Sequence, residues 1–502
     1  MSKTDSNLKL LYVYVFCAAA VLYVATCAPG VLWQDSGLIQ YRVWHNDIEG
    51  RLGLALSHPL YYLIAIVAKH VPLGELAYRI NVLTAVISAF AVANLFLLLR
   101  LLLGETFPAL LGAATFALSH TFWRHSTMPE TYGLAMTLLL LELIMLLQYA
   151  RTSRVKYLYF LALINGLAIA NHVLASIALL CYLVLSFTFL LNKQIKIKHL
   201  AIMVMFWIVG AIPYEYLIIK NIIQSGDIMG TLTSAAFGNS WQGAVLNTKL
   251  TIQMVKENLM YIVLNFPTPN ILFVLVGFGC LYIVSPKRWY ANVLMGILIL
   301  YFIFAFRYTV QDRYVFFIPF YCMISILIGA GSYSYLRKSS GGFYLMTMFC
   351  FMVIPIYAML PKIADDLDIK IGSVRKLYYR NDSTYFLYPW KMNYNEARKF
   401  ARQALSNVNP PAIIYSDATA APPLLYAQQV WKEQEGEDIK IISSIGSSEN
   451  SPDFNALTIE KLMSEKNIYV VSTNKGYCPD FLQSRYNFEP WGVVWHVVEK
   501  DK

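Results

Sequence analysis

Long apolar runs separated by short polar loops recur along most of the sequence, and they leave few folds open to it. A helix needs about 20 apolar residues to cross the hydrocarbon core of a bilayer. Only 14% of the residues are charged and 57% are hydrophobic, whereas a soluble domain carries about 25% charged residues. The apolar segment 59–71 is too short for a span and is expected to lie at the membrane interface. We therefore predict a polytopic α-helical membrane protein of about eleven spans, near residues 10–28, 79–103, 107–122, 130–150, 157–171, 173–191, 199–220, 259–284, 290–306, 314–335 and 342–360.

Basic residues gather in four short loops between these runs, at residues 151–156, 192–199, 285–289 and 335–340. Because Lys and Arg concentrate in cytoplasmic loops, these loops and the amino terminus are predicted to face the cytoplasm. The opposite side then holds everything after about residue 361 and the loops at 29–78, 123–129, 221–258 and 307–313. Arg124 and His125 are an exception, since they place charge on the outer side. The basic loops account for the net charge of +10, so no nucleic-acid partner is expected.

The composition changes after about residue 360, where the apolar runs end. Residues 394–405 have the spacing of an amphipathic helix. Four short apolar segments are typical of buried strands, at 411–417, 439–443, 467–472 and 493–498, and helical stretches near 420–433 and 457–465 separate the first three. This alternation predicts a small α/β domain with a mostly parallel sheet. We therefore divide the chain into a transmembrane domain (1–360) and an extracytoplasmic α/β domain (361–502).

The first outer loop is unusually polar for its surroundings and contains Asp35, His58 and the amphipathic ring of Trp33. A carboxylate just outside a span, under aromatic cover, can have a shifted pKa and act as a base. The alternative is that Asp35, in the sequence Asp-Ser-Gly, caps a helix or forms a turn. Residue types alone leave both interpretations open.

Other outer loops hold further candidates with structural alternatives. Glu130 is a possible catalytic carboxylate, but Thr127 to Glu130 also has the T-x-x-E pattern of a capping box. Arg307 and Arg313 could bind a donor phosphate, or they could anchor helix ends at the membrane surface. His172 lies between two spans, where a hydrogen-bonded helix-end histidine is the simpler interpretation.

Several outer-loop strings resemble the protein O-mannosyltransferase-like membrane family, which belongs to the GT-C class of glycosyltransferases. They are WQDSG (33–37), SHP (57–59), RINVLTA (79–85), ALSHTFWRHSTMPETYGL (117–134) and ANH (170–172). The carboxy-terminal strings NYNEARKFARQAL (393–405) and PPAIIYSDATAAPPLLYAQQ (410–429) are also similar to that family. Leu38, Leu60 and Tyr61 depart from the family pattern and leave the acceptor open.

The resemblance implies transfer of a sugar, with inversion, from a polyprenyl-phosphate donor to an acceptor on the outer face. It places the catalytic acidic residues at Asp35 and Glu130, and we expect substrate contacts from Trp33, His58, Arg124 and His172. A lipid phosphate is a good leaving group, so a single base suffices, with Arg307 and Arg313 to stabilise the phosphate. The expected partners are a polyprenyl-phosphate sugar, a protein or glycan acceptor and membrane lipid. No metal-ligand motif is present, so a reaction without metal or cofactor is expected.

Two alternatives from other classes stay open. A transporter or flippase of lipid-linked saccharide would also carry outer arginines and polar groups, although such carriers often show repeats and broken helices. An inactive membrane scaffold, whose outer domain binds a partner, is the other. The expected location is a bacterial inner membrane, or the endoplasmic reticulum membrane in a eukaryote, with the carboxy-terminal domain outside the cytoplasm.

Overall fold

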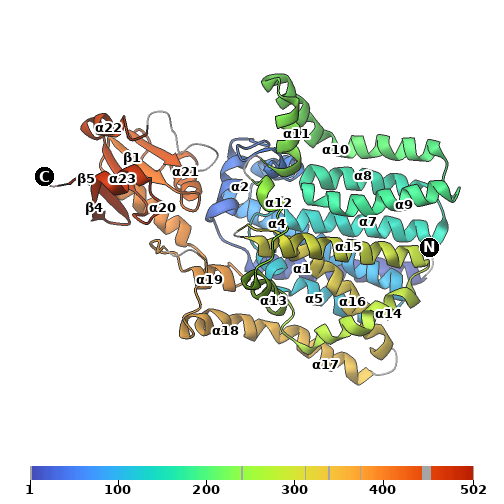
Figure 1. The fold of residues 1–502 in the computed structure, drawn as a ribbon. Helices are drawn as coiled ribbons and strands as arrows, with labels where there is room; N and C mark the ends of the chain where they lie inside the picture. The colour runs from blue at the N-terminus through green and yellow to red at the C-terminus, as the bar shows by residue number, and fades with distance from the viewer. Residues whose placement is uncertain are drawn as a thin grey trace.

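The computed structural model describes residues 3–500 apart from 239–240, 311, 337–339, 373–374 and 444–453. Its membrane part is a bundle of long apolar helices, and a small domain with a β-sheet lies at one end of that bundle (Figure 1). The predicted fold class, a polytopic helical membrane protein with a small α/β domain, is confirmed. Residues 337–339 of the predicted basic loop 335–340 lie outside the described residues.

In the described part of the chain, eight helical segments are long and apolar enough to cross a membrane. They are α1 (Lys3–Thr26), α4 (Leu76–Leu103), α7 (Tyr132–Thr152), η3 (Val173–Ala175) with α9 (Ser176–Leu191), α10 (Ile197–Ser225), α15 (Arg288–Arg307), η5 (Arg313–Phe317) with α16 (Ile318–Leu336), and α17 (Ser340–Phe351) with α18 (Val353–Asp366). A ninth span is possible from α13 (Ile252–Asn265), η4 (Pro269–Leu272) and α14 (Phe273–Val284), which are bent by 109°.

Two of the eleven predicted runs form helices that are short for a span. Run 107–122 breaks into α5 (Thr106–Ala117) and α6 (His120–Ser126), because Leu118 and Ser119 leave helical geometry between them. Run 157–171 forms α8 (Lys156–Asn171), whose 16 residues extend about 24 Å. This helix packs closely on α10, where a Cβ on Gly166 would lie 2.2 Å from the carbonyl oxygen of Trp207. Close packing against neighbours, rather than lipid contact alone, therefore accounts for part of the apolar sequence.

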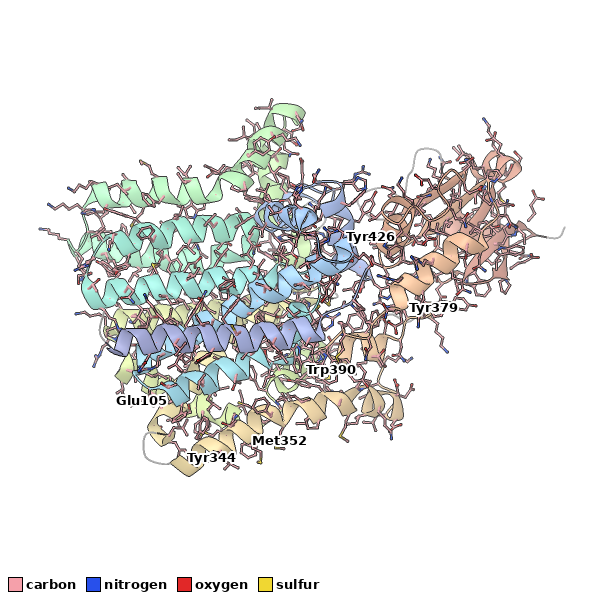
Figure 2. All side chains as sticks on the ribbon, turned by 180° about the vertical axis from the view of Figure 1, so that it is seen from behind. Glu105, Tyr344, Met352, Tyr379, Trp390 and Tyr426 are labelled. Carbon is pink, nitrogen blue, oxygen red and sulfur yellow. The ribbon has the colours of Figure 1, made fainter. Side chains whose placement is uncertain are left out.

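The end of the bundle near the small domain is built from short helices and loops. These are α2 (Gln34–Trp44), η1 (Leu54–Leu56), α3 (Pro59–Val67), η2 (Ala68–His70), α11 (Ile228–Phe237) and α12 (Gln242–Val245). The predicted interfacial segment 59–71 thus forms a nine-residue helix and a 3₁₀ turn. The amino terminus and the α9–α10 connection lie at the opposite end of the bundle (Figure 1). Glu105 and Tyr344 also lie at that far end (Figure 2).

The small domain has a five-stranded sheet of order β2-β1-β3-β5-β4. Its elements are α19 (Asp382–Leu387), α20 (Glu396–Asn407), β1 (Ala412–Ser416), α21 (Ala421–Gln429), β2 (Ile439–Ser443), α22 (Ile459–Glu465), β3 (Asn467–Val470), α23 (Asp480–Arg485), β4 (Tyr486–Trp491) and β5 (Val494–Glu499). All four predicted strands are present, but the sheet is mixed rather than mostly parallel. Strand β1 runs parallel to β2 and β3, whereas β5 runs antiparallel to β3 and β4. The unpredicted β4 is an edge strand with an exposed carboxyl-terminal half, so it lacks the apolar pattern of a buried strand.

Candidate active site

Asp35 lies in the first turn of α2, at the end of the bundle that faces the small domain. The cap position is Trp33, and no side chain caps this helix. The alternative interpretation of Asp35 as a helix cap is therefore wrong. Within the described residues, the Asp35 carboxylate accepts no hydrogen bond, although its side chain has surface open to solvent. Its oxygens are therefore available to accept a hydrogen bond from a bound molecule.

Glu130 precedes α7 without capping it. Helix α7 begins at Tyr132, its cap residue is Thr131, and no side chain caps it. The Thr127 hydroxyl instead donates to the carbonyl oxygens of Arg124 (2.8 Å) and Pro389 (2.9 Å). The capping-box interpretation is therefore wrong. Glu130 accepts a hydrogen bond of 3.2 Å from the hydroxyl of Ser36, the neighbour of Asp35.

Asp35, Glu130 and Asp312 interact electrostatically and form what we call the acidic recess. Burial, then the charge of Asp312, raises the pKa of Asp35 to about 6. Burial, then the charge of Asp35, raises the pKa of Glu130 to about 8. Asp35 and Asp312 nevertheless have exposed side chains, and burial also raises the pKa of Asp312. Asp35 and Asp312 therefore keep accessible surface while the protein around them disfavours their charged forms.

The pKa values assign different protonation states to Asp35 and Glu130. Asp35 loses its proton first, and its charge then opposes ionisation of Glu130. At neutral pH the recess therefore holds an ionised Asp35 beside a mostly protonated Glu130, a separation typical of acid–base sites.

Asp312 was not among the residues predicted from the sequence. It lies in the loop between Arg307 and Arg313, the two arginines predicted to bind phosphate. Asp312 is one of several carboxylates in the loops predicted to face outward, and nothing in the sequence places its loop beside Asp35. The fold brings the two together over 277 residues of chain.

Arg124 supplies positive charge to the recess. Its guanidinium is 2% exposed, and it donates to the Tyr385 carbonyl oxygen (Nε, 3.3 Å) and the Tyr314 hydroxyl (Nη1, 2.6 Å). Its charge lowers the pKa of both Glu130 and Asp312 against the effect of burial. Arg124 is thus buried within the protein, so its charge in a loop predicted to face outward does not contradict the pattern of the basic loops.

The two arginines predicted to bind phosphate have protein partners. Arg307 donates to the carbonyl oxygens of Val245 (2.7 Å) and Asn247 (2.6 Å). Arg313 forms an ion pair with Glu257 and donates to the Asn258 side chain at 3.1 Å. Their predicted role toward a donor stays a prediction, and for Arg313 it requires exchange of a carboxylate for a phosphate.

The rings of His58 and His172 contact each other in a tilted arrangement, with an interplanar angle of 46°. Their ring centroids lie 4.6 Å apart. The His58 Nδ1 lies 2.9 Å from the Asn171 carbonyl, so that nitrogen carries a proton. The His172 Nδ1 accepts from the Leu174 amide at 3.1 Å, as predicted for a helix-end histidine. Burial lowers the pKa of His58 to about 4 and that of His172 as well. Both rings are therefore neutral at neutral pH.

Trp33 packs into the interface with the small domain. Its side chain has no accessible surface, its indole N–H donates to the Tyr394 hydroxyl at 2.9 Å, and its ring lies 5.2 Å from that of Phe400. The predicted contact of Trp33 with substrate stays a prediction, and in this structure the residue joins two parts of the chain. Further along the interface, the Ala77 amide donates to the Tyr426 hydroxyl at 3.0 Å. Figure 2 labels Tyr426 where the small domain meets the bundle.

The chain resembles known proteins in sequence and in structure. Residues 55–196 match the family described as protein O-mannosyl-transferase TMEM260 N-terminal domain. The protein O-mannosyl-transferase TMEM260 of Mus musculus is 24% identical over 220 residues, which are 42% of this chain and 30% of that protein. The chain thus spans less than a third of the length of this curated relative. The match agrees with the resemblance predicted from the outer-loop strings.

Solved structures of ArnT from Cupriavidus metallidurans share the fold over nearly the whole chain. The structure bound to undecaprenyl phosphate has a TM-score of 0.62 and 12% sequence identity, and it covers 99% of this chain and 98% of that one. The apo structure has a TM-score of 0.59 and 13% identity with the same coverage. At this identity the likeness establishes the fold, which confirms the GT-C-like architecture predicted from the sequence.

Proposed function

We propose that this protein is an integral membrane glycosyltransferase that moves a sugar from a polyprenyl-phosphate donor to an acceptor hydroxyl, with Asp35 as the base. The observation that carries the proposal is the Asp35 carboxylate. It has no hydrogen-bond donor among the described residues, it is accessible, and its pKa is about 6. A base with a pKa near 6 is ionised at neutral pH and still accepts a proton readily. The match to O-mannosyl-transferase TMEM260 and the fold shared with ArnT support the reaction class.

The reaction needs one displacement. The acceptor oxygen attacks the anomeric carbon of the donor while Asp35 takes its proton, and the bond from that carbon to the phosphate oxygen breaks. The electron pair leaves with polyprenyl phosphate, so the configuration at the anomeric carbon inverts. The phosphate is a good leaving group and needs no strong acid, unlike the leaving group of a glycosidase. Because Glu130 is protonated, it adds no negative charge beside the departing phosphate. The positive charge of Arg124 offsets the negative charge that develops on that phosphate.

The location of the recess supports the choice of substrates. The recess lies at the end of the bundle, near the membrane surface, where a lipid-linked phosphate and a soluble acceptor can meet. The small domain borders it, so a protein or glycan acceptor would approach through this domain. We propose that this end faces away from the cytoplasm, as the basic loops predict, and that the transfer requires neither metal nor cofactor. Chelation with EDTA is then expected to leave transfer unchanged.

The test uses purified full-length protein in detergent with labelled mannosyl-phosphoryl-undecaprenol. Membranes from cells in which the gene is deleted supply the acceptor. Asp35→Asn is expected to lower transfer at least about a hundredfold, because an amide cannot take the proton. Asp227→Asn is the matched control, since Asp227 caps α11 outside the recess and Asn caps equally well.

The outcomes distinguish a glycosyltransferase from a flippase and from an inactive scaffold, neither of which forms labelled product. Transfer that depends on Asp35 supports the proposal. A flippase would give no labelled product in detergent, where no compartments exist. Turnover of Asp35→Asn near that of the unaltered protein would refute the role given to this residue.

A further inference from the structure

Residues 33–36, at the start of α2, are held from two sides. Trp33 and Gln34 bond to the small domain, through the Tyr394 hydroxyl and the Thr419 carbonyl oxygen, respectively. Asp35 and Ser36 face the acidic recess, where Ser36 donates to Glu130. The same four residues thus join the small domain to the candidate base.

Gln34 has a backbone conformation that a side chain disfavours. Its φ is +56°, in the left-handed region where non-glycine residues carry a steric cost. Two bonds from the small domain hold it there. The Gln34 amide donates to the Thr419 carbonyl oxygen at 3.1 Å, and Arg380 donates to the Gln34 side-chain oxygen at 3.1 Å. Because Asp35 follows directly, the φ of Gln34 sets the direction in which α2 begins.

The Thr419 carbonyl is itself fixed by a buried ion pair. Asp417 follows β1 and accepts a hydrogen bond of 2.8 Å from the Thr419 amide. Arg375 pairs with the Asp417 carboxylate at 2.6 Å, and the two side chains are 2% and 8% exposed. The turn after β1 is therefore rigid at the point where it contacts Gln34.

We propose that the Asp417–Thr419 turn of the small domain is a positioning element for Asp35, acting through the left-handed backbone of Gln34. This inference rests on the proposed function, because it assigns the small domain a part in the same transfer. Neither Asp417 nor Gln34 touches substrate. Loss of the turn lets Gln34 relax to negative φ, which moves the Asp35 carboxylate away from the acceptor hydroxyl.

The first test compares two backbone conformations at residue 34, and both variants lose the side-chain oxygen to which Arg380 donates. Gln34→Pro removes the N–H that Thr419 accepts and excludes positive φ, so kcat is expected to fall about a hundredfold, as a misplaced catalytic group does. The KM for the donor is expected to stay the same. Gln34→Gly keeps the N–H and adopts positive φ without steric cost, so kcat is expected to stay within about fivefold. A purely structural role would not separate these two variants by kcat alone.

The second test combines Gln34→Gly with Asp417→Ala in the full-length protein. Without the turn, a glutamine returns to negative φ, whereas a glycine occupies both regions about equally. The loss of kcat caused by Asp417→Ala is therefore expected to be about tenfold smaller when residue 34 is glycine. If Gln34→Pro does not fold, this double-mutant comparison still tests the proposal. Tyr426→Phe is the matched control, because it removes an interface hydrogen bond to Ala77 without involving residue 34.

Two results would overturn the inference. One is a folded Gln34→Pro variant with unchanged kcat, and the other is an equal loss from Asp417→Ala in both backgrounds. In either case, an inactive Asp35→Asn variant would leave the proposed function standing. An active Asp35→Asn variant would remove the proposed function itself.

Discussion

Asp312 offers a test of the recess through the pH dependence of transfer. Asp35 must be ionised to take a proton, so kcat/KM is expected to rise as the pH increases through the pKa of Asp35, about 6. Asp312 raises that pKa by charge repulsion. Asp312→Asn removes the charge, so the acidic limb of the profile is expected to move to lower pH.

The size of the change follows from the causes of the pKa elevation. The pKa rises from 3.8 to about 6, and burial contributes more than Asp312. Asp312 therefore accounts for less than half of the difference, and its removal should lower the limb by at most about one pH unit. At pH 5, about 9% of Asp35 is ionised with a pKa of 6 and about 50% with a pKa of 5. The largest expected gain at pH 5 is thus about fivefold, and it disappears at pH 8.

The assay measures kcat/KM for labelled donor between pH 4.5 and pH 8.5, with Asp312→Glu as the control that keeps the charge. In Asp312→Glu, the acidic limb of the kcat/KM profile should lie at nearly the same pH as in the unaltered protein. A limb that does not move in Asp312→Asn, or that moves to higher pH, would refute the electrostatic coupling between Asp312 and Asp35.

Three further changes test other parts of the structure. Glu130→Gln copies the protonated state of Glu130 expected below pH 8. Transfer at pH 6.5 should therefore stay within about tenfold of the unaltered protein, and any decline of transfer above pH 8 should vanish. Inactivity of this variant at every pH would contradict the assignment. Glu257→Gln removes the ion pair of Arg313. If Arg313 binds the donor phosphate, the KM for the donor should fall. An unchanged KM with a lower Tm would show that Arg313 only anchors the helix end. Because the side chain of Phe400 is fully buried, Phe400→Ala should lower the free energy of unfolding by about 3–5 kcal/mol. Denaturant midpoints measure this loss, and a loss below about 1 kcal/mol would contradict the packing.

The membrane architecture follows from the sequence because the cost of exposing backbone to lipid is the same for every span. Length and apolarity therefore identify most helices without knowledge of their neighbours. The number of spans does not follow, because helices such as α8 are apolar through packing on protein. Likewise, β1 and β3 are buried and were predicted, whereas the polar edge strand β4 was not.

The candidate site was predicted in part. Asp35 and Glu130 were identified through family resemblance, while residue types alone left capping as an alternative for each. Only the structure shows that neither residue caps a helix. Asp312 could not be found from the sequence, because its significance is its electrostatic coupling to Asp35 in the fold. The partners of Arg313 are equally remote in sequence, since Glu257 and Asn258 precede it by more than 50 residues.

The division at residue 360 describes the composition of the chain better than its packing. Helix α18 continues through that boundary to Asp366. One hydrophobic cluster contains Trp33 and Met128, from loops 29–78 and 123–129, together with Phe400 and Leu424 of the small domain. Because part of this core comes from the segment that carries Asp35, the small domain cannot move away without exposing Trp33. Asp35 and the small domain are therefore coupled by the hydrophobic effect as well as by hydrogen bonds. This shared core is the physical reason to expect changes in the small domain to reach the chemistry.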